Sequence, residues 1–176
     1  MYEVETDRLV LRRWARTDLD ALARVFAKPE VWWWPFQRGW TTEETEEFLD
    51  RKLAEWEDRG WSQWAAVEKR TATLIGFIGL CPPGFLPEVM PTVEVGWRLD
   101  PEYWHLGYAT EGGRAALTMG FDALGLDEIV SIYEPDNVAS GKVMQRLGMT
   151  VDRDTTHPRL GVPLRVYKIT ADQWKS

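Results

Sequence analysis

The segment from Trp104 to Glu111 constrains this chain more than any other, because it joins a strand-like stretch directly to a helix-like one. Residues 92–99 alternate as a strand does, and a helical pattern begins near Thr110. The connection contains Gly107 and Ala109, whose small side chains let a ligand approach the main chain closely. A helix N-terminus leaves several N–H groups without a partner and favours negative charge. The sequence therefore predicts an anion site at this turn.

A second helix start lies downstream, where Asn137-Val138-Ala139-Ser140 opens a helix that ends at Leu147-Gly148. Asn is a favoured residue at the position that caps a helix. Together, the two helix starts suggest a phosphate-bearing cofactor held beside a strand.

Apolar periodicity, helix caps and turn residues predict the remaining elements. A helix capped by Thr17 is expected to end before Pro29, and a capping box at Thr41 and Glu44 opens the next helix. The expected strands are 6–14, 63–68, 73–80, 92–99, 128–133, 150–153 and 164–169, and the later helices are 41–58, 110–124 and 137–147. This order predicts one α/β domain over residues 1–176, with a mixed, largely antiparallel sheet.

Composition narrows the class of protein. The 176 residues carry a net charge of −7, which argues against nucleic-acid binding, and no apolar run is long enough to span a membrane. The N-terminus shows no secretory signal, and the single cysteine, Cys81, fits a reducing cytoplasm. No metal is expected. The 11 tryptophans are unusual, and most lie in the N-terminal half.

Four motifs, in this order, resemble the GNAT superfamily of acyl-CoA-dependent N-acyltransferases. They are Thr6–Arg12, Val93–Leu99, Gly107–Glu111, and Asn137–Ser140 followed by Arg146–Met149. Within the superfamily, the chain looks most like the branch that contains the ribosomal-protein N-terminal acetyltransferases. The resemblance implies a GNAT-like single domain whose central sheet splays between strands 4 and 5, with helices on both faces.

Three positions depart from superfamily patterns. Trp104 stands where the turn usually begins with Gln or Arg. Met144 and Ile132 stand where some amino-terminal acetyltransferases carry a Tyr general acid and a Glu. That acid/base pair is therefore not carried over to this chain.

The resemblance implies acetyl-CoA, or another acyl-CoA, as co-substrate. The turn would hold its diphosphate, the fourth strand would run beside its pantetheine arm, and Asn137 would reach that arm. The expected cofactor residues are Trp97, Arg98, Leu99, His105, Leu106, Gly107, Tyr108, Ala109, Thr110, Asn137 and Ser140. Basic residues Arg114, Lys142 and Arg146 are candidates for the 3′-phosphate. An ordinary turn, a fully paired strand, a plain helix cap and helix-surface charges are the structural alternatives.

Three residues are catalytic candidates. Strand alternation places Glu94 on the face opposite Val93 and Val95, so we expect it to be the general base; the alternative is a carboxylate paired with Arg98 or solvent. Ser140 is expected to face the thioester sulfur and stabilise the thiolate. Tyr133 is a weaker candidate acid, and a buried structural tyrosine is the alternative.

The Trp-rich segment 31–40 is expected to wall the acceptor site, with core packing or a subunit contact as alternatives. Its candidate contacts are Trp33, Trp34, Phe36 and Trp40. His157 lies in a loop that is a lesser candidate for this site. The expected reaction is acetyl transfer to a primary amine, with a peptide or protein N-terminus as acceptor and a small amine or antibiotic as the alternative. A non-catalytic acyl-CoA sensor is the alternative of another class, and a monomer or homodimer is expected.

Overall fold

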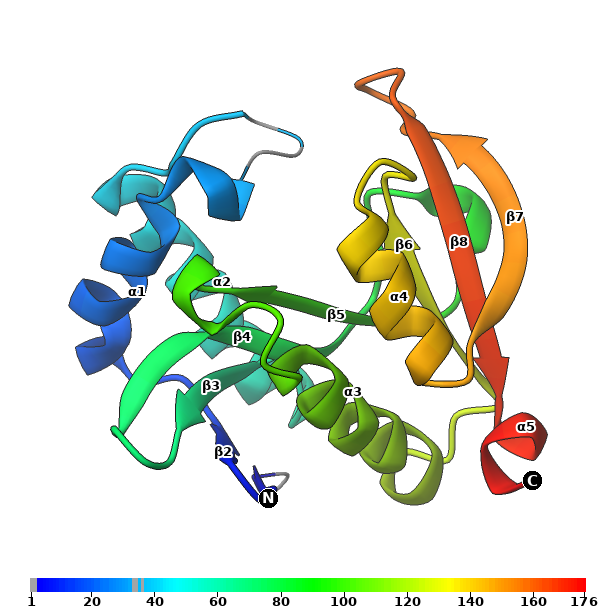
Figure 1. Ribbon diagram of the computed structural model, residues 1–176, viewed down its shortest axis with the longest axis horizontal. Coiled ribbons are helices and arrows are strands. Elements are labelled where there is room, and N and C mark those ends of the chain that lie inside the picture. The colour runs from blue at the N-terminus through cyan, green and yellow to red at the C-terminus, as the bar shows by residue number, and fades with distance from the viewer. Residues whose placement is uncertain (1–2, 33–34, 36) are drawn as a thin grey trace. The chain divides into compact units, whose positions relative to one another are not determined.

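The computed structural model describes residues 3–32, 35 and 37–176 of the chain. These residues fall into two compact units, described separately below: Met1–Gly79 with Trp97–Gly112 form unit 1, and Leu80–Gly96 with Gly113–Ser176 form unit 2. The chain crosses between the units within β4 (Thr73–Cys81), β5 (Glu94–Leu99) and α3 (Tyr108–Thr118), three elements that are labelled in Figure 1. A single domain over 1–176 stays a prediction.

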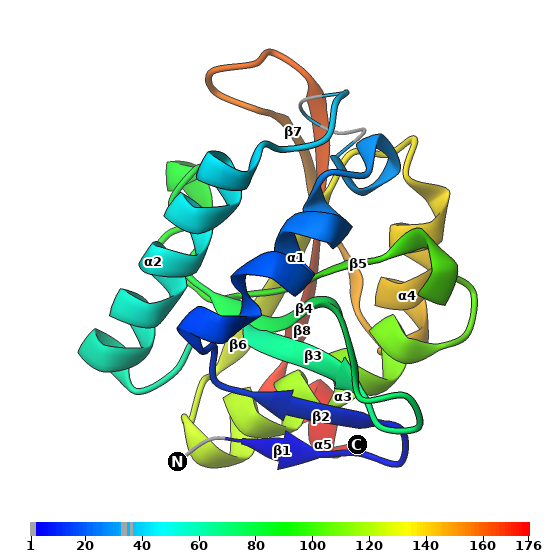
Figure 2. The same ribbon diagram turned by 90° about the vertical axis from the view of Figure 1, so that its left-hand side faces the viewer.

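Unit 1 is built on an antiparallel sheet. Its strands are β1 (Val4–Glu5), β2 (Leu9–Arg12), β3 (Trp64–Glu68) and the first part of β4. Figure 2 shows β1 and β2 side by side near the N-terminus, with Val4 opposite Leu11. The strand predicted over 6–14 is shorter than expected, because the chain turns between β1 and β2, where the Thr6 N–H donates to the Leu9 carbonyl at 2.9 Å.

The helices α1 (Leu19–Phe26) and α2 (Thr42–Arg59) of unit 1 lie side by side (Figures 1 and 2). The capping box predicted for α2 is confirmed: the Glu44 N–H donates to the Thr41 hydroxyl at 3.2 Å, and the Thr41 N–H donates to the Glu44 carboxylate at 2.9 Å. Gly60, with φ of +76°, ends α2 in the left-handed conformation that glycine adopts most readily.

The start of α1 differs from the prediction. Thr17 does not cap the helix, because it lies inside the short 3₁₀ turn η1 (Arg16–Asp18). The Asp18 carboxylate accepts the Ala15 N–H at 2.8 Å and pairs with Arg12 at 2.7 Å. Asp18 occupies the cap position of α1, but its side chain binds Ala15 and Arg12 instead of the helix, so neither residue makes the predicted side-chain cap.

An aromatic cluster fills the space around α1 in unit 1. The ring of Phe26 meets Trp32, Trp40 and Phe48 edge-on, at centroid distances of 4.9, 5.3 and 5.2 Å. Trp32, at the end of η2 (Pro29–Trp32), stacks on Trp40 at 3.7 Å. Edge-on and stacked rings add to the apolar area that each aromatic side chain buries. This cluster explains part of the tryptophan excess as core packing.

Unit 2 contains β6 (Glu128–Tyr133), β7 (Thr150–Thr156) and β8 (Pro163–Thr170). β8 pairs antiparallel with both β6 and β7, while β5 pairs parallel with β6. The hydrogen-bonded strand order is β1-β2-β3-β4-β5-β6-β8-β7. The mixed, largely antiparallel sheet predicted from the sequence is therefore confirmed.

The helices of unit 2 are the rest of α3, α4 (Val138–Arg146) and α5 (Ala171–Lys175). The helix predicted to reach Leu124 is regular only to Thr118, after which Met119–Ala123 form a π-helical turn, η5. Two 3₁₀ turns complete the chain, η3 (Pro87–Val89) in unit 2 and η4 (Pro101–Tyr103) in unit 1. Within the described ranges, no helix has the length and apolar character that crossing a membrane requires.

Candidate functional site

The turn before α3 leaves a row of main-chain N–H groups without acceptors. The helix begins at Tyr108, two residues earlier than predicted, and its first hydrogen bond runs from the Glu111 N–H to the Gly107 carbonyl at 3.0 Å. No residue that the structure describes accepts the N–H groups of Gly107, Tyr108, Ala109 or Thr110. The geometry is therefore that of an anion-binding helix N-terminus.

The conformation of the turn requires special backbone angles. Gly107 has φ of +89°, and His105 has φ of +61°, a region that few non-glycine residues occupy. His105 and Leu106 are exposed, whereas Tyr108 is buried and its hydroxyl lies 3.4 Å from the Glu68 carboxylate. Burial, together with the negative charge of Glu68, raises the pKa of Tyr108, so its phenol stays neutral.

Thr110 supports the assignment of a ligand to this turn. Its hydroxyl oxygen is buried and has no hydrogen-bond partner within the residues described. Buried polar atoms in proteins nearly always have a partner, so an orphan hydroxyl in the first turn of α3 is an expected place for a bound polar group. The residues present therefore fit a phosphate-bearing ligand.

The end of β5 lies next to this turn in sequence and is tied to it. Trp104, which stands where the superfamily usually has Gln or Arg, donates its indole N–H to the Leu99 carbonyl at 2.8 Å. The Arg98 guanidinium lies 3.9 Å from the centre of the Trp32 ring and donates to the Val31 carbonyl. The side chain of Arg98 thus holds η2. Pantetheine contacts by Trp97, Arg98 and Leu99 stay a prediction.

In unit 2, β5 and β6 separate after a single paired position, Glu94 opposite Val130, which confirms the predicted splay between the fourth and fifth strands. Two side chains bridge the separating strands. The Ile132 N–H donates to Glu94 Oε1 at 3.3 Å, and the Ser131 hydroxyl donates to the Val95 carbonyl at 2.8 Å. Side-chain groups therefore replace backbone pairing that the splay removes.

The bridge ties Glu94 to the end of β6, the strand that contains Tyr133. The Glu94 carboxylate accepts the N–H of Ile132, the residue before Tyr133. The Tyr133 side chain packs against the first turn of α4, because a Cβ on Gly141 would lie 3.0 Å from the Tyr133 hydroxyl. Burial and the neighbouring Tyr167 raise the pKa of Tyr133. A neutral phenol is able to donate a proton.

The predicted cap of α4 is confirmed. Asn137 Oδ1 accepts the Ser140 N–H at 3.1 Å, so the carboxamide oxygen is used by the helix. The carboxamide NH₂ of Asn137 makes no hydrogen bond within the part of the chain that is described, and it remains available to a ligand. Cofactor contacts by Asn137 and Ser140 stay predictions.

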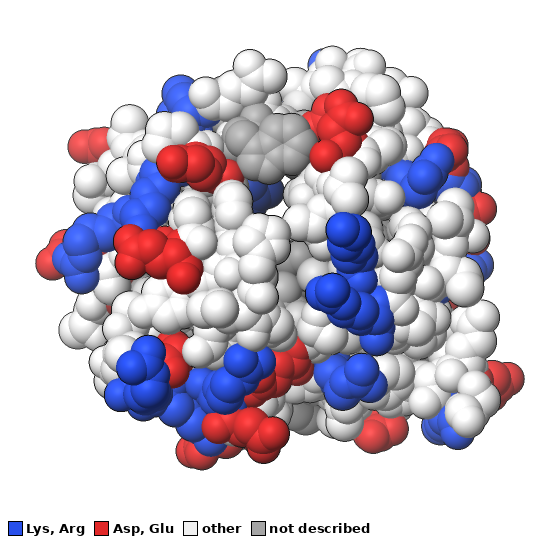
Figure 3. All heavy atoms as spheres, viewed as in Figure 1, with Lys and Arg blue, Asp and Glu red and all other residues white. Residues whose placement is uncertain are grey.

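A basic group lies on α3 and α4. Lys142 and Arg146 are one helical turn apart and exposed, and Arg114 Nη2 lies 3.5 Å from the Arg146 carbonyl. None of the three forms an ion pair with a carboxylate among the described residues. Figure 3 shows Lys and Arg side chains gathered over α4. Unpaired cations in an acidic chain favour an anion partner.

The acceptor candidates are only partly covered by the structure. Trp33, Trp34 and Phe36 lie outside the described residues. Trp40 is part of the aromatic cluster of unit 1, and its contact with an acceptor stays a prediction. His157 is buried, stacks on Phe85 at 5.5 Å, and accepts two backbone N–H groups through Nδ1. It shapes the β7–β8 loop.

Comparison with known proteins bears directly on these features. The family described as "Acetyltransferase (GNAT) domain" matches residues 8–150, which include the turn, the splayed strands and the cap of α4. The chain belongs to the GNAT acetyltransferase family. It is therefore an acyl-CoA-dependent N-acetyltransferase, as the four motifs indicated.

Individual relatives agree with this membership. The chain is 29% identical over 146 residues to the uncharacterized N-acetyltransferase YoaA of Bacillus subtilis (strain 168), covering 82% of this chain and 81% of that protein. A crystal structure of an acetyltransferase from Agrobacterium tumefaciens str. C58 is 28% identical, with a TM-score of 0.78 and coverage of 96% and 94%. The "FsC-acetyl coenzyme A-N(2)-transacetylase" of Aspergillus fumigatus is 36% identical over 87 residues, 46% of this chain and 37% of that protein.

Sequence reasoning missed two features of the site. It did not assign a role to Arg8, which contacts the turn from the opening strand, or to Ser131, which bridges β5 and β6. Both contacts join residues far apart in sequence. The only signal for Arg8 was its place in the Thr6–Arg12 motif.

Proposed function

We propose that this acetyltransferase transfers the acetyl group of acetyl-CoA directly to the α-amine of a peptide or protein N-terminus. The row of unpaired N–H groups before α3 is the observation that carries the proposal, because it matches the diphosphate of the co-substrate. The basic residues Arg114, Lys142 and Arg146 would meet its 3′-phosphate, and the NH₂ of Asn137 would contact its pantetheine arm.

The energetics of the acceptor amine favour an α-amine. The nitrogen must be neutral to attack, and neutralising a lysine side chain with pKa about 10.4 costs roughly 4–5 kcal/mol at pH 7. An α-amine with pKa near 8 costs only about 1 kcal/mol. A single carboxylate base, Glu94, is better matched to the smaller cost.

The proposed chemistry uses three residues of unit 2. Glu94 takes a proton from the amine through a water molecule, while the nitrogen forms a bond to the thioester carbonyl carbon. The main-chain N–H of Trp97, beyond the paired position of β5 and β6, stabilises the developing oxyanion, because the parallel pairing of Glu94 with Val130 already uses the Val95 N–H. As the C–S bond breaks, Ser140 donates a hydrogen bond to the thiolate, and Tyr133 returns a proton to it. The acyl group passes directly between the substrates, without a covalent enzyme intermediate.

A small-molecule amine is the second candidate acceptor. It is supported by the name of the Aspergillus fumigatus relative, an "N(2)-transacetylase", which does not mention a protein N-terminus, although the match covers only 37% of that protein. The Trp-rich segment would then form an apolar slot for a compact acceptor.

Thiol release from acetyl-CoA with a panel of peptides and small amines tests the proposal. Peptides that differ only in the first residue should be substrates, and blocking their α-amine should abolish turnover. Turnover with small amines alone would select the second candidate. Absence of thiol release with every amine would contradict both.

The Glu94→Gln variant tests the base. Glutamine keeps an oxygen that can accept the Ile132 N–H, so the β5–β6 bridge survives while the base is lost. We expect kcat to fall on the order of 10²–10⁴-fold. Glu128→Gln, which removes an exposed carboxylate from β6, is the matched control and should keep wild-type turnover. A loss below threefold in Glu94→Gln across the pH range would exclude this role.

A further inference from the structure

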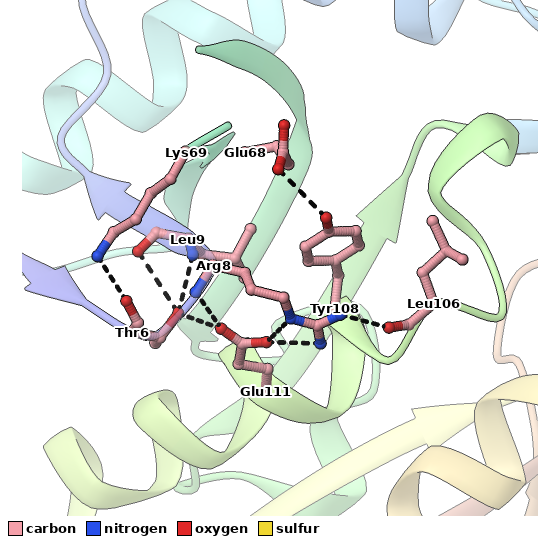
Figure 4. Close-up of polar contacts among 8 residues, drawn as sticks. All are labelled: Thr6, Arg8, Leu9, Glu68, Lys69, Leu106, Tyr108 and Glu111. Atoms are coloured by element: carbon pink, nitrogen blue, oxygen red, sulfur yellow. Dashed lines mark hydrogen bonds and ion pairs between the residues drawn. The ribbon is translucent and has the colours of Figure 1, made fainter. Parts of the chain in front are cut away.

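The opening strand of the chain contacts the turn before α3. Arg8 Nη1 donates to the Leu106 carbonyl at 2.8 Å, and its guanidinium carbon lies 4.5 Å from the centre of the Tyr108 ring (Figure 4). The two segments are about a hundred residues apart in sequence, yet both belong to unit 1. Arg8 therefore reaches the same residues that present the unpaired N–H groups.

Glu111, in the first turn of α3, fixes the Arg8 side chain. Its Oε2 accepts Arg8 Nε at 2.7 Å and pairs with Nη2 at 2.6 Å, while Oε1 accepts the Arg8 main-chain N–H at 2.8 Å. The Thr6 hydroxyl also donates to Oε1 at 2.5 Å. Burial opposes ionisation of Glu111, but the bonds from Thr6 and Arg8 outweigh it and lower the pKa of this carboxyl. The carboxylate thus stays charged and holds the fork-shaped guanidinium in place.

The contact of Arg8 with the Leu106 carbonyl sets the direction in which the Gly107 N–H points. In a planar trans peptide, the C=O and N–H groups point in opposite directions. Because Arg8 binds the carbonyl of the Leu106–Gly107 peptide, the Gly107 N–H points away from Arg8. The Gly107 carbonyl is in turn held by the Glu111 N–H at 3.0 Å, which directs the Tyr108 N–H out of the helix end. Arg8 and Glu111 therefore fix two successive peptides.

We propose that Arg8, held by Glu111, is a positioning residue that keeps the N–H groups of the turn aimed at the diphosphate of the co-substrate. This inference rests on the proposed function of the turn. An exposed ion pair contributes little to stability, and the Arg8 side chain is 45% exposed. Its larger effect is on preorganisation, because donors fixed in advance bind a diphosphate without a reorganisation cost.

The Arg8→Lys variant tests the inference. Lysine keeps the charge, but its single ammonium cannot reproduce the guanidinium, which binds Glu111 Oε2 through Nε and Nη2 and the Leu106 carbonyl through Nη1. We expect the Kd for CoA, measured by calorimetry, to rise about tenfold. The Kd for pantetheine, which lacks the diphosphate and is measured by ligand-observed NMR, should stay unchanged, as should Tm within a few degrees.

Lys69→Met is the matched control. It removes a hydrogen bond to the Thr6 carbonyl at 2.6 Å and an ion pair with Glu5, and neither contact involves the turn. Its affinity for CoA should equal that of the wild type.

The outcomes separate this inference from the proposed function. A wild-type Kd for CoA in Arg8→Lys overturns the inference, and so does a parallel loss of CoA and pantetheine affinity, which indicates general loosening. If Arg8→Lys does not fold, Glu111→Gln replaces it, with an expected rise of about threefold for CoA alone. A wild-type protein that does not bind CoA more tightly than pantetheine overturns the proposed function of the turn itself.

Discussion

Gly107 shows how much of this site is decided by one residue. Its φ of +89° and its lack of a side chain let the chain turn sharply and leave the neighbouring N–H groups accessible. A Cβ at this position would lie 3.3 Å from Arg8 Nη2, so even a small side chain would press on the group that holds the turn. The demands of backbone conformation and of ligand access therefore coincide at this residue.

We expect Gly107→Glu to weaken CoA binding about a hundredfold or more, because a carboxylate would repel the diphosphate where it approaches the main chain. Calorimetry measures the affinity, and circular dichroism checks the fold. Gly60→Glu is the matched control. Gly60 has φ of +76° with no atom near its Cβ position, so a glutamate there has a similar left-handed backbone strain and meets no neighbour. Unchanged affinity in Gly107→Glu would refute the placement of the diphosphate.

Individual elements differ in how far their sequences determine them. The capping box of α2, the Asn137 cap of α4 and the bounds of β6 follow from local patterns and are confirmed. α5 was not predicted, because five residues are too few to show helical periodicity. The π-helical turn after α3 was also missed, since side-chain patterns do not report a change of hydrogen-bond register.

The candidate site also contains some features that the local sequence determines and others that it does not. Local motifs located the turn and the α4 cap, because those depend on neighbouring residues. The bridge from Ser131 to Val95 and the contact of Arg8 with Leu106 depend on tertiary pairing, which a single sequence does not display. The roles of Glu94, Tyr133 and Ser140 stay predictions, since they require a substrate.

The two ends of the Asn137 carboxamide can be tested separately. Its oxygen caps α4, and its NH₂ remains available to a ligand. Asn137→Asp keeps the capping oxygen and loses the NH₂, so we expect wild-type stability and a Kd for CoA raised about fivefold or more. Asn137→Ala should lose about 1 kcal/mol of unfolding free energy as well. Urea denaturation and calorimetry measure the two quantities. Equal CoA affinity for Asn137→Asp and wild type would show that Asn137 caps the helix and does not contact CoA.

At the scale of the whole molecule, the buried His157 should make part of the stability of the fold depend on pH. His157 accepts the N–H groups of Arg159 and Leu160 through Nδ1, so only a ring unprotonated at that atom keeps both bonds. Burial, and then the charge of Arg159, lower the pKa of His157. The unfolded chain therefore takes up a proton more readily than the folded one as pH falls.

We expect the unfolding free energy to hold above the unfolded pKa of about 6.5 and to fall as pH drops below it, because the lowered folded pKa favours the neutral ring. Asn in place of His157 offers an acceptor that does not titrate, so His157→Asn should show a smaller loss between pH 7 and pH 5. Urea denaturation at several pH values measures this. A pH dependence identical to that of the wild type would show that His157 does not contribute.

The bridge across the separating strands also bears on how this enzyme could be engineered. Ser131 and Glu94 satisfy main-chain groups that the gap exposes, so an apolar replacement at either position would leave a carbonyl or an amide unmet. Directed evolution toward a new amine should therefore keep both positions constant in its libraries. Diversity is better placed in the Trp-rich segment 31–40, which takes no part in these two hydrogen bonds, with Trp32 and Trp40 kept because they pack in the aromatic cluster.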